Sequence, residues 1–141
     1  ETLKSGESSE EKAYQEIKDQ LGIDPVRLVN SSTEIEFVSA EIDGQLGTAL
    51  LLYRKNEEIV SYVISCAQTD EVWGFDVEDI LLNEYPYSLE KVKVSIKEYK
   101  FRETEENKYV SSFDYKDVHY QLTGIMTKNE MEEILNNLHF L

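Results

Sequence analysis

Apolar residues recur at helical spacing near the start of the chain. Ala13, Tyr14, Ile17 and Leu21 lie one, three and four positions apart, which places them on one face of a helix. Gly22 follows directly, and a glycine at this point predicts a left-handed residue that ends the helix. We therefore expect an N-terminal helix with one apolar face.

The middle of the chain has the patterns of β-strands. Residues 48–53 are apolar on both faces, which predicts a central strand covered on both sides. Just before them, Asp43 and Gly44 predict a two-residue hairpin turn, because a type I′ turn needs positive φ at both positions. The other segments with strand character are residues 34–39, 59–67, 92–99, 109–115 and 118–126.

Residues 68–89 are the least regular part of the sequence. Within them, residues 76–83 are compatible with either a short helix or an edge element. The aromatic residues of this stretch are Trp73, Phe75, Tyr85 and Tyr87. Because binding residues concentrate on loops and aromatic faces stack on sugars or hold peptides, these four are our candidate ligand-binding residues. The alternative is that they fill one end of the core.

The end of the chain predicts a second helix. Thr127 and Glu130 form a capping box, in which the hydroxyl and the carboxylate each accept from the other residue's backbone amide. An apolar stripe at helical spacing follows, made of Met131, Ile134, Leu135 and Leu138. That stripe needs a partner, and the sheet is the large apolar surface available to it.

The order of these elements defines the fold class. Short connections between consecutive strands favour antiparallel pairing over a doubly wound sheet. We predict an α+β fold, with a curved antiparallel sheet of about six strands and an N-terminal and a C-terminal helix packed on one face. Residues 1–8 are predicted to be a disordered or linker segment, and residues 9–141 a single α+β domain.

Composition limits the possible partners. The chain has 141 residues, with 29 acidic and 14 basic side chains and a net charge of -15. Nucleic acids and anionic membrane surfaces carry phosphates that would repel this charge, so we expect no nucleic-acid partner. There is no apolar run of about 18 residues, so the domain itself is not expected to span a membrane.

Conventional catalytic and metal-binding patterns do not occur in the sequence. Cys66 is the single cysteine, which excludes an internal disulfide and a zinc site built from several thiolates. It has the parity of Tyr62 and Ile64, which predicts a buried structural thiol rather than a nucleophile paired with His119 or His139. The acidic residues between positions 70 and 84 lack the spacing of an EF-hand loop. We expect no catalytic residue, no metal and no cofactor.

Residues 113–138 resemble the C-terminal part of a bacterial family, the domain of unknown function 4367. The matching residues are Tyr120, Leu122, Gly124, Thr127 and Glu130, in a strand followed by a Thr-initiated turn and an acidic helix. The resemblance implies an extracytoplasmic domain of Gram-positive bacteria, tethered by a membrane helix or a lipid. It implies no known catalytic residues.

These observations predict a non-enzymatic extracytoplasmic interaction or sensory domain, held at the cell surface by an anchor N-terminal to this chain. The partner classes compatible with it are protein, peptide and cell-wall glycan, and the sequence leaves the oligomeric state open. The alternative is a small hydrolase or ligand-processing enzyme with its site in the concave face of the sheet. That alternative predicts a pocket with carboxylates or His119.

Overall fold

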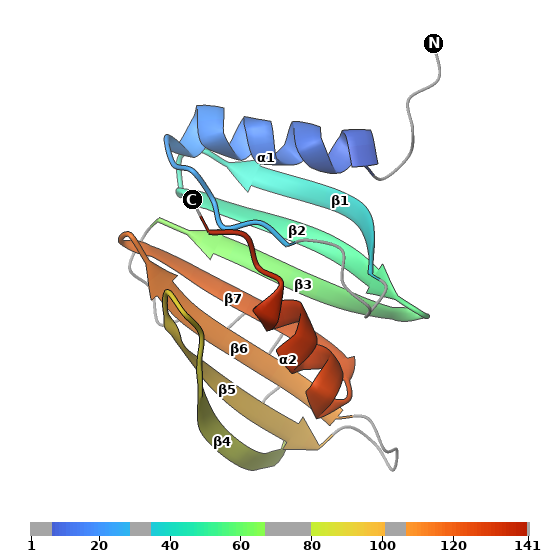
Figure 1. Cartoon of the computed structure of the whole chain (residues 1–141). Helices are drawn as coiled ribbons and strands as arrows, with labels where there is room; N and C mark the ends of the chain where they lie inside the picture. The colour runs from blue at the N-terminus through green and yellow to red at the C-terminus, as the bar shows by residue number, and fades with distance from the viewer. Residues whose placement is uncertain (1–6, 29–34, 67–79, 101–106, 141) are drawn as a thin grey trace.

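The computed structural model describes residues 7–28, 35–66, 80–100 and 107–140. They form one sheet of seven antiparallel strands in the order β1-β2-β3-β7-β6-β5-β4, with two helices on one of its faces (Figure 1). The elements in chain order are α1 (Glu7–Leu21), β1 (Glu36–Asp43), β2 (Thr48–Lys55), β3 (Glu58–Ser65), β4 (Ile80–Ser88), β5 (Lys93–Lys100), β6 (Asn107–Tyr115), β7 (Val118–Met126) and α2 (Lys128–Asn136).

The predicted α+β class, with an antiparallel sheet and a helix near each end, is confirmed. The sheet has seven strands rather than about six, because Ile80–Ser88 forms β4 where the sequence left a helix or an edge element open. This strand holds Pro86, which lacks a backbone N–H and is tolerated at a sheet edge. β2 lies second from the opposite edge rather than in the centre of the sheet.

The turn after Asp43 differs from the prediction. A four-residue loop joins β1 to β2, and Gly47, not Gly44, has the positive φ, 70°. The Asp43 carboxylate accepts from the backbone amides of Gln45 and Leu46, both at 3.0 Å. Side-chain bonds to the loop amides therefore favour a longer turn over the two-residue hairpin.

Both helices bury apolar side chains against the same face of the sheet. From α1, Tyr14 and Ile17 are fully buried, and Gly22 ends the helix with a φ of 69°. From α2 the buried residues are Met131, Ile134 and Leu135. The core of the domain therefore lies between the sheet and the two helices.

Two short segments, each following a helix, cross the space between α1 and α2 (Figure 1). They pair as an antiparallel bridge, in which Arg27 N–H donates to His139 O at 3.1 Å and His139 N–H donates to Arg27 O at 2.9 Å. We call residues 26–28 and 138–140 the bridged segments. They close the helix-covered face between the two helices.

Tyrosine hydroxyls form hydrogen bonds with the buried backbone N–H and C=O groups of residues 26–28. Tyr62 O–H donates to Val26 O at 2.6 Å, and Val26 N–H donates to the Tyr120 hydroxyl at 3.2 Å. Leu28 N–H donates to the Tyr14 hydroxyl at 3.1 Å. Burial raises the pKa of Tyr120 to about 12, against the lowering effect of its bond from Val26. These phenols therefore stay protonated at neutral pH and act as fixed partners for the backbone.

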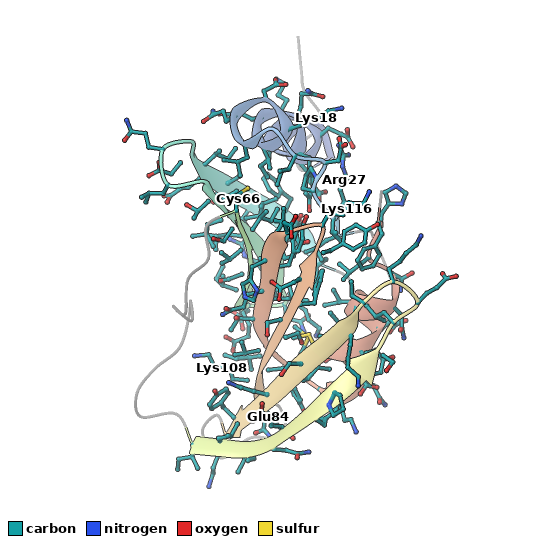
Figure 2. The ribbon with its side chains drawn as sticks, turned by 90° about the vertical axis from the view of Figure 1, so that its left-hand side faces the viewer. Lys18, Arg27, Cys66, Glu84, Lys108 and Lys116 are labelled. Atoms are coloured by element: carbon teal, nitrogen blue, oxygen red, sulfur yellow. The ribbon has the colours of Figure 1, made fainter. Side chains whose placement is uncertain are left out.

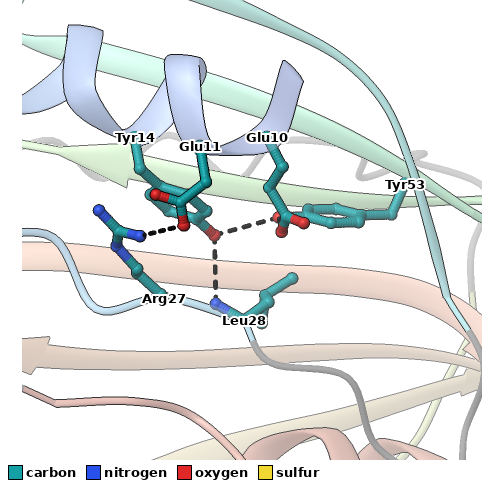
Figure 3. A network of polar contacts seen from close by, with 6 residues as sticks. All are labelled: Glu10, Glu11, Tyr14, Arg27, Leu28 and Tyr53. Atoms are coloured by element: carbon teal, nitrogen blue, oxygen red, sulfur yellow. Dashed lines mark hydrogen bonds and ion pairs between the residues drawn. The ribbon is translucent and has the colours of Figure 1, made fainter. Parts of the chain in front are cut away.

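The same network extends to α1 (Figure 3). The Tyr14 and Tyr53 hydroxyls lie 3.0 Å apart, and Tyr53 O–H donates to the Glu10 carboxylate at 2.6 Å. Arg27 pairs with Glu11 at 2.9 Å and stacks over the Tyr14 ring, 4.8 Å from its centroid. Burial, with the neighbouring Tyr14 and Glu10, raises the pKa of Tyr53 well above its usual value. The first turns of α1 are thus fixed by polar as well as apolar contacts.

Ser111 is a buried residue whose hydroxyl lacks a hydrogen-bond partner among the described residues. It is fully buried between its strand partners Ile96 and Leu122, and no group in the described residues bonds its hydroxyl. Because an unpaired buried hydroxyl carries a desolvation cost, Ser111→Ala is expected to raise the free energy of unfolding by about 1 kcal/mol. Urea denaturation measures this change, and a loss of stability in its place would show that the hydroxyl has a partner.

Candidate interaction edge

Three consecutive apolar side chains are exposed at the start of β4. Ile80 is 60% exposed, Leu81 48% and Leu82 51%. We call these three residues the apolar tip. Glu84 follows them on the same edge strand, at the opposite end of the sheet from α1 and its Lys18 (Figure 2). Contiguous exposed apolar side chains are common at sites where proteins bind one another, so the apolar tip is our candidate interaction surface.

The rest of β4 is fastened to α2. Tyr85 O–H donates to Glu132 at 3.2 Å, and Tyr87 O–H donates to Asn136 at 3.0 Å. The Lys128 ammonium lies 4.8 Å from the centroid of the Tyr85 ring. Burial, and next Glu132, raise the pKa of Tyr85 well above its usual value. The edge strand is therefore held in place just beyond the apolar tip.

The four predicted ligand-binding residues are placed as follows. Tyr85 and Tyr87 are half-buried on the helix-covered face, packed against the core. Trp73 and Phe75 lie outside the described residues. Sequence reasoning did not single out Ile80 to Leu82, although three consecutive apolar residues before the Tyr-Pro-Tyr run are visible in the sequence.

The outer backbone of β4 lacks two of the free N–H donors that another strand would use, at Glu84 and Pro86. Leu89 N–H donates to Val92 O at 2.9 Å, and the alternation of an antiparallel ladder then points the backbone of Pro86 and Glu84 away from β5. Pro86 has no N–H, and the Glu84 N–H donates to the Asn83 side chain at 2.9 Å. Such blunting is a known protection of sheet edges.

The β1–β2 hairpin holds a second candidate surface. A groove of about 600 Å³ lies there, and its lining includes Gln20, Glu41, Asp43 and Leu46. Leu46 is 65% exposed. The Asp43 carboxylate already accepts hydrogen bonds from the loop amides of Gln45 and Leu46, so it is less available to bind a ligand in this groove.

Cys66 and His119 do not meet. Cys66 has the parity of Ile64 and faces the helix-covered side, whereas His119 pairs with Ser65 and projects from the other side. His119 Nδ1 lies 2.8 Å from the Asp114 carboxylate. The Cys66 side chain is half-buried rather than fully buried, and burial raises the pKa of its thiol. A cysteine–histidine nucleophile pair is therefore not formed by these two residues.

Helix α2 begins at a second polar cluster. The capping box is present: Glu130 N–H donates to the Thr127 hydroxyl at 3.2 Å and Thr127 N–H donates to the Glu130 carboxylate at 2.9 Å. Lys55, at the end of β2, places its Nζ 2.9 Å from Glu130, with only 7% of the lysine side chain exposed. Burial opposes ionisation of Glu130, but the Thr127 amide and Lys55 outweigh it and hold the pKa below its usual value.

The five residues that carry the family resemblance all have structural positions. Tyr120 bonds the backbone of residues 26–28, Leu122 is buried in the core, and Thr127 with Glu130 caps α2. A side chain at Gly124 would place its Cβ 3.2 Å from the Val60 side chain. The matching residues thus maintain the fold rather than form a reactive site.

The described residues form an α+β fold, with an open antiparallel sheet, two helices on one face and an exposed apolar tip on β4. The chain belongs to a known family: the family model "Domain of unknown function (DUF4367)" matches residues 29–138, which is most of the chain. No curated protein and no solved structure matches significantly. Helix α1 lies before the matched region.

The described ranges lack two further features. None of their helices is long and apolar enough to cross a membrane. Nor do they contain a group of three or more His, Cys, Asp or Glu residues arranged to hold a metal ion.

Proposed function

We propose that this chain is a non-enzymatic interaction or sensory domain that acts outside the cell, tethered by an anchor N-terminal to it. The observation that carries the interaction part is the apolar tip on a firmly held edge strand. Burying a large apolar side chain contributes about 1.5–3 kcal/mol, so three such residues supply much of the free energy of a specific contact.

The extracytoplasmic location is supported by the resemblance of residues 113–138 and by membership of the family. A single cysteine is compatible with the outside of bacteria that make little use of disulfides. The structural positions of the five matching residues agree with a family that has no assigned catalytic residues.

The enzymatic alternative has less support in the described residues. The helix-covered face of the sheet is filled by the core, and His119 is paired with Asp114 on the other face. The non-enzymatic proposal therefore accounts for more of the observed geometry.

One labelling experiment tests both parts of the proposal. In a Cys66→Ser background, Leu81→Cys and Leu46→Cys each place a thiol at an exposed position, and a membrane-impermeant maleimide is applied to intact cells that produce the whole protein. We expect Leu46→Cys to react on intact cells. We expect Leu81→Cys to react at least about tenfold more slowly on cells than in the purified domain, because a partner covers it.

The two parts fail in different ways. If both variants react only after lysis, the extracytoplasmic location is wrong. If Leu81→Cys reacts on cells as fast as in the purified domain, while Leu46→Cys also reacts, the apolar tip is uncovered and is not the interaction surface.

A further inference from the structure

We infer that the groove at the β1–β2 hairpin binds a small organic cation, a primary amine attached to an apolar chain. The groove lies at the opposite edge of the sheet from the apolar tip, and the inference does not depend on what the tip binds. Its volume of about 600 Å³ is within the range of about 300–1,000 Å³ that is usual for small-molecule sites.

The groove lies where the end of β1 meets the C-terminal end of α1 (Figure 1). The Gln20 side chain reaches the hairpin from α1, because a Cβ placed on Gly44 would lie 3.3 Å from the Gln20 Oε1 atom. The Gln20 side-chain N–H donates to the Glu16 carboxylate at 2.9 Å. The amide oxygen is therefore the atom that Gln20 presents to the hairpin, and it accepts hydrogen bonds.

The two charged side chains that line the groove are both acidic. Glu41 and Asp43 are two positions apart on β1, so they project from the same face of the strand, and both are exposed. Both loop amides bond the Oδ1 atom of Asp43, which leaves its Oδ2 atom for a ligand. Two like charges at this spacing favour a bound cation and disfavour an anion.

The basic residues of the neighbouring elements are engaged with other acids. In the part of the chain that the structure describes, neither Glu41 nor Asp43 belongs to an ion pair. The engaged pairs are Lys18–Asp24 at 3.4 Å, Arg54–Glu36 at 3.7 Å and His119–Asp114 at 2.8 Å. The acidic charge of the groove is therefore not compensated by these bases.

Apolar side chains lie beside the two carboxylates. Leu50 is the ladder partner of Glu41, and Val63 is the partner of Leu50, so these three residues form one row across β1, β2 and β3. Leu46, in the loop, also lines the groove and is 65% exposed. A ligand with its ammonium at β1 and its apolar chain over Leu46 and Leu50 contacts both kinds of lining.

A metal ion fits this lining less well than an organic cation. Calcium and magnesium take about six or more oxygen ligands, whereas the groove offers two carboxylates, and one oxygen of Asp43 is already used. A hydrated ion also covers no apolar surface. An alkyl chain removes the exposed leucine surface from water, which is favourable.

The test is a titration of the purified, isotope-labelled chain by nuclear magnetic resonance, followed at the backbone amides of Leu46 and Leu50. The probes are hexylamine, hexanoate, hexanol and ethylamine. Hexanoate reverses the charge, hexanol removes it, and ethylamine removes most of the apolar chain. We expect hexylamine to bind at least about tenfold more tightly than each of the others, and more weakly as salt is raised.

Two charge variants locate the site. Glu41→Gln keeps the size of the side chain and is expected to weaken hexylamine binding at least about fivefold. The matched control is Glu36→Gln, which removes a carboxylate from the other end of the same strand and is expected to leave binding unchanged. Both variants change the net charge equally, so a difference between them reports the position of the ligand. Circular dichroism confirms that both are folded.

The other outcomes overturn the inference. Hexanoate that binds as tightly as hexylamine removes the charge requirement, and ethylamine that binds as tightly removes the apolar one. A Glu41→Gln variant that binds like the parent, or like Glu36→Gln, places the amine elsewhere on the acidic surface. Calcium that displaces hexylamine at equal concentration makes the ligand an inorganic ion.

Failure of this inference is distinguishable from failure of the proposed function. The titration follows the β1–β2 hairpin, whereas protection of Leu81→Cys on cells follows the apolar tip at the opposite edge of the sheet. A small amine that exchanges rapidly leaves Leu46→Cys reactive on cells, so the labelling control is unaffected. Loss of amine binding therefore leaves the interaction role in place.

Discussion

Replacing Tyr14 with alanine is expected to lower the free energy of unfolding by about 3–5 kcal/mol, measured by urea denaturation. The ring is almost fully buried between α1 and the sheet, so its removal leaves a cavity. Its hydroxyl also accepts from Leu28 N–H and contacts the Tyr53 hydroxyl. Both apolar packing and two polar contacts are lost together.

Two further variants separate these contributions. Tyr14→Phe keeps the ring and loses the hydroxyl, so it is expected to cost about 1–3 kcal/mol. Tyr87→Phe removes an exposed hydroxyl bonded to Asn136 and is the matched control, with an expected change below about 0.5 kcal/mol. Parental stability in Tyr14→Ala would show that α1 contributes little to the fold.

Replacing Glu130 with alanine is expected to lower the free energy of unfolding by about 2–4 kcal/mol. The change removes one half of the capping box. It also leaves the ammonium of Lys55 inside the protein without its carboxylate, and an uncompensated buried charge is strongly destabilising. Because about a third of the Glu130 side chain is exposed, water moderates the loss.

The same pair sets part of the acid stability. The folded state holds the pKa of Glu130 below its usual value of 4.5. Its contribution is therefore fully present above about pH 4.5 and is lost as the pH falls through the lower pKa of the folded protein. Glu130→Gln keeps a side chain that can cap the helix, and we expect it to remove this part of the acid dependence of unfolding.

Lys55→Met is the control for the buried charge. A methionine fills similar space without an ammonium, so its expected effect on stability is within about 1 kcal/mol of the parent. A loss as large as that of Glu130→Ala would show that attraction between the two charges, rather than the cost of an unpaired lysine, dominates.

Local signals in the sequence were sufficient for the helices. The spacing of Tyr14 and Ile17, the left-handed Gly22 and the Thr127–Glu130 capping box each involve residues within a few positions of one another. Such patterns depend on local backbone geometry, which is why the helices predicted from them are present in the structure.

The remainder depends on contacts between residues far apart in the sequence. Lys55 meets Glu130, and Tyr85 meets Glu132, only after the strands have taken their order in the sheet. The sequence did not predict β4 as a strand, because a strand at an exposed edge shows little alternation of apolar and polar residues. The apolar tip was missed for the related reason that an apolar run predicts burial, and only the structure shows these side chains in solvent.

The bridge between Arg27 and His139 has a consequence for synthesis on the ribosome. Helix α1 is translated before the described strands, yet the segment that joins it to the core pairs with residues that follow α2. Tyr120, which also bonds that segment, is made late as well. The hydrogen bonds to residues 26–28 therefore form only after residues 120 and 139 have been made, so the segment that follows α1 is fixed in place late in the folding of this sheet.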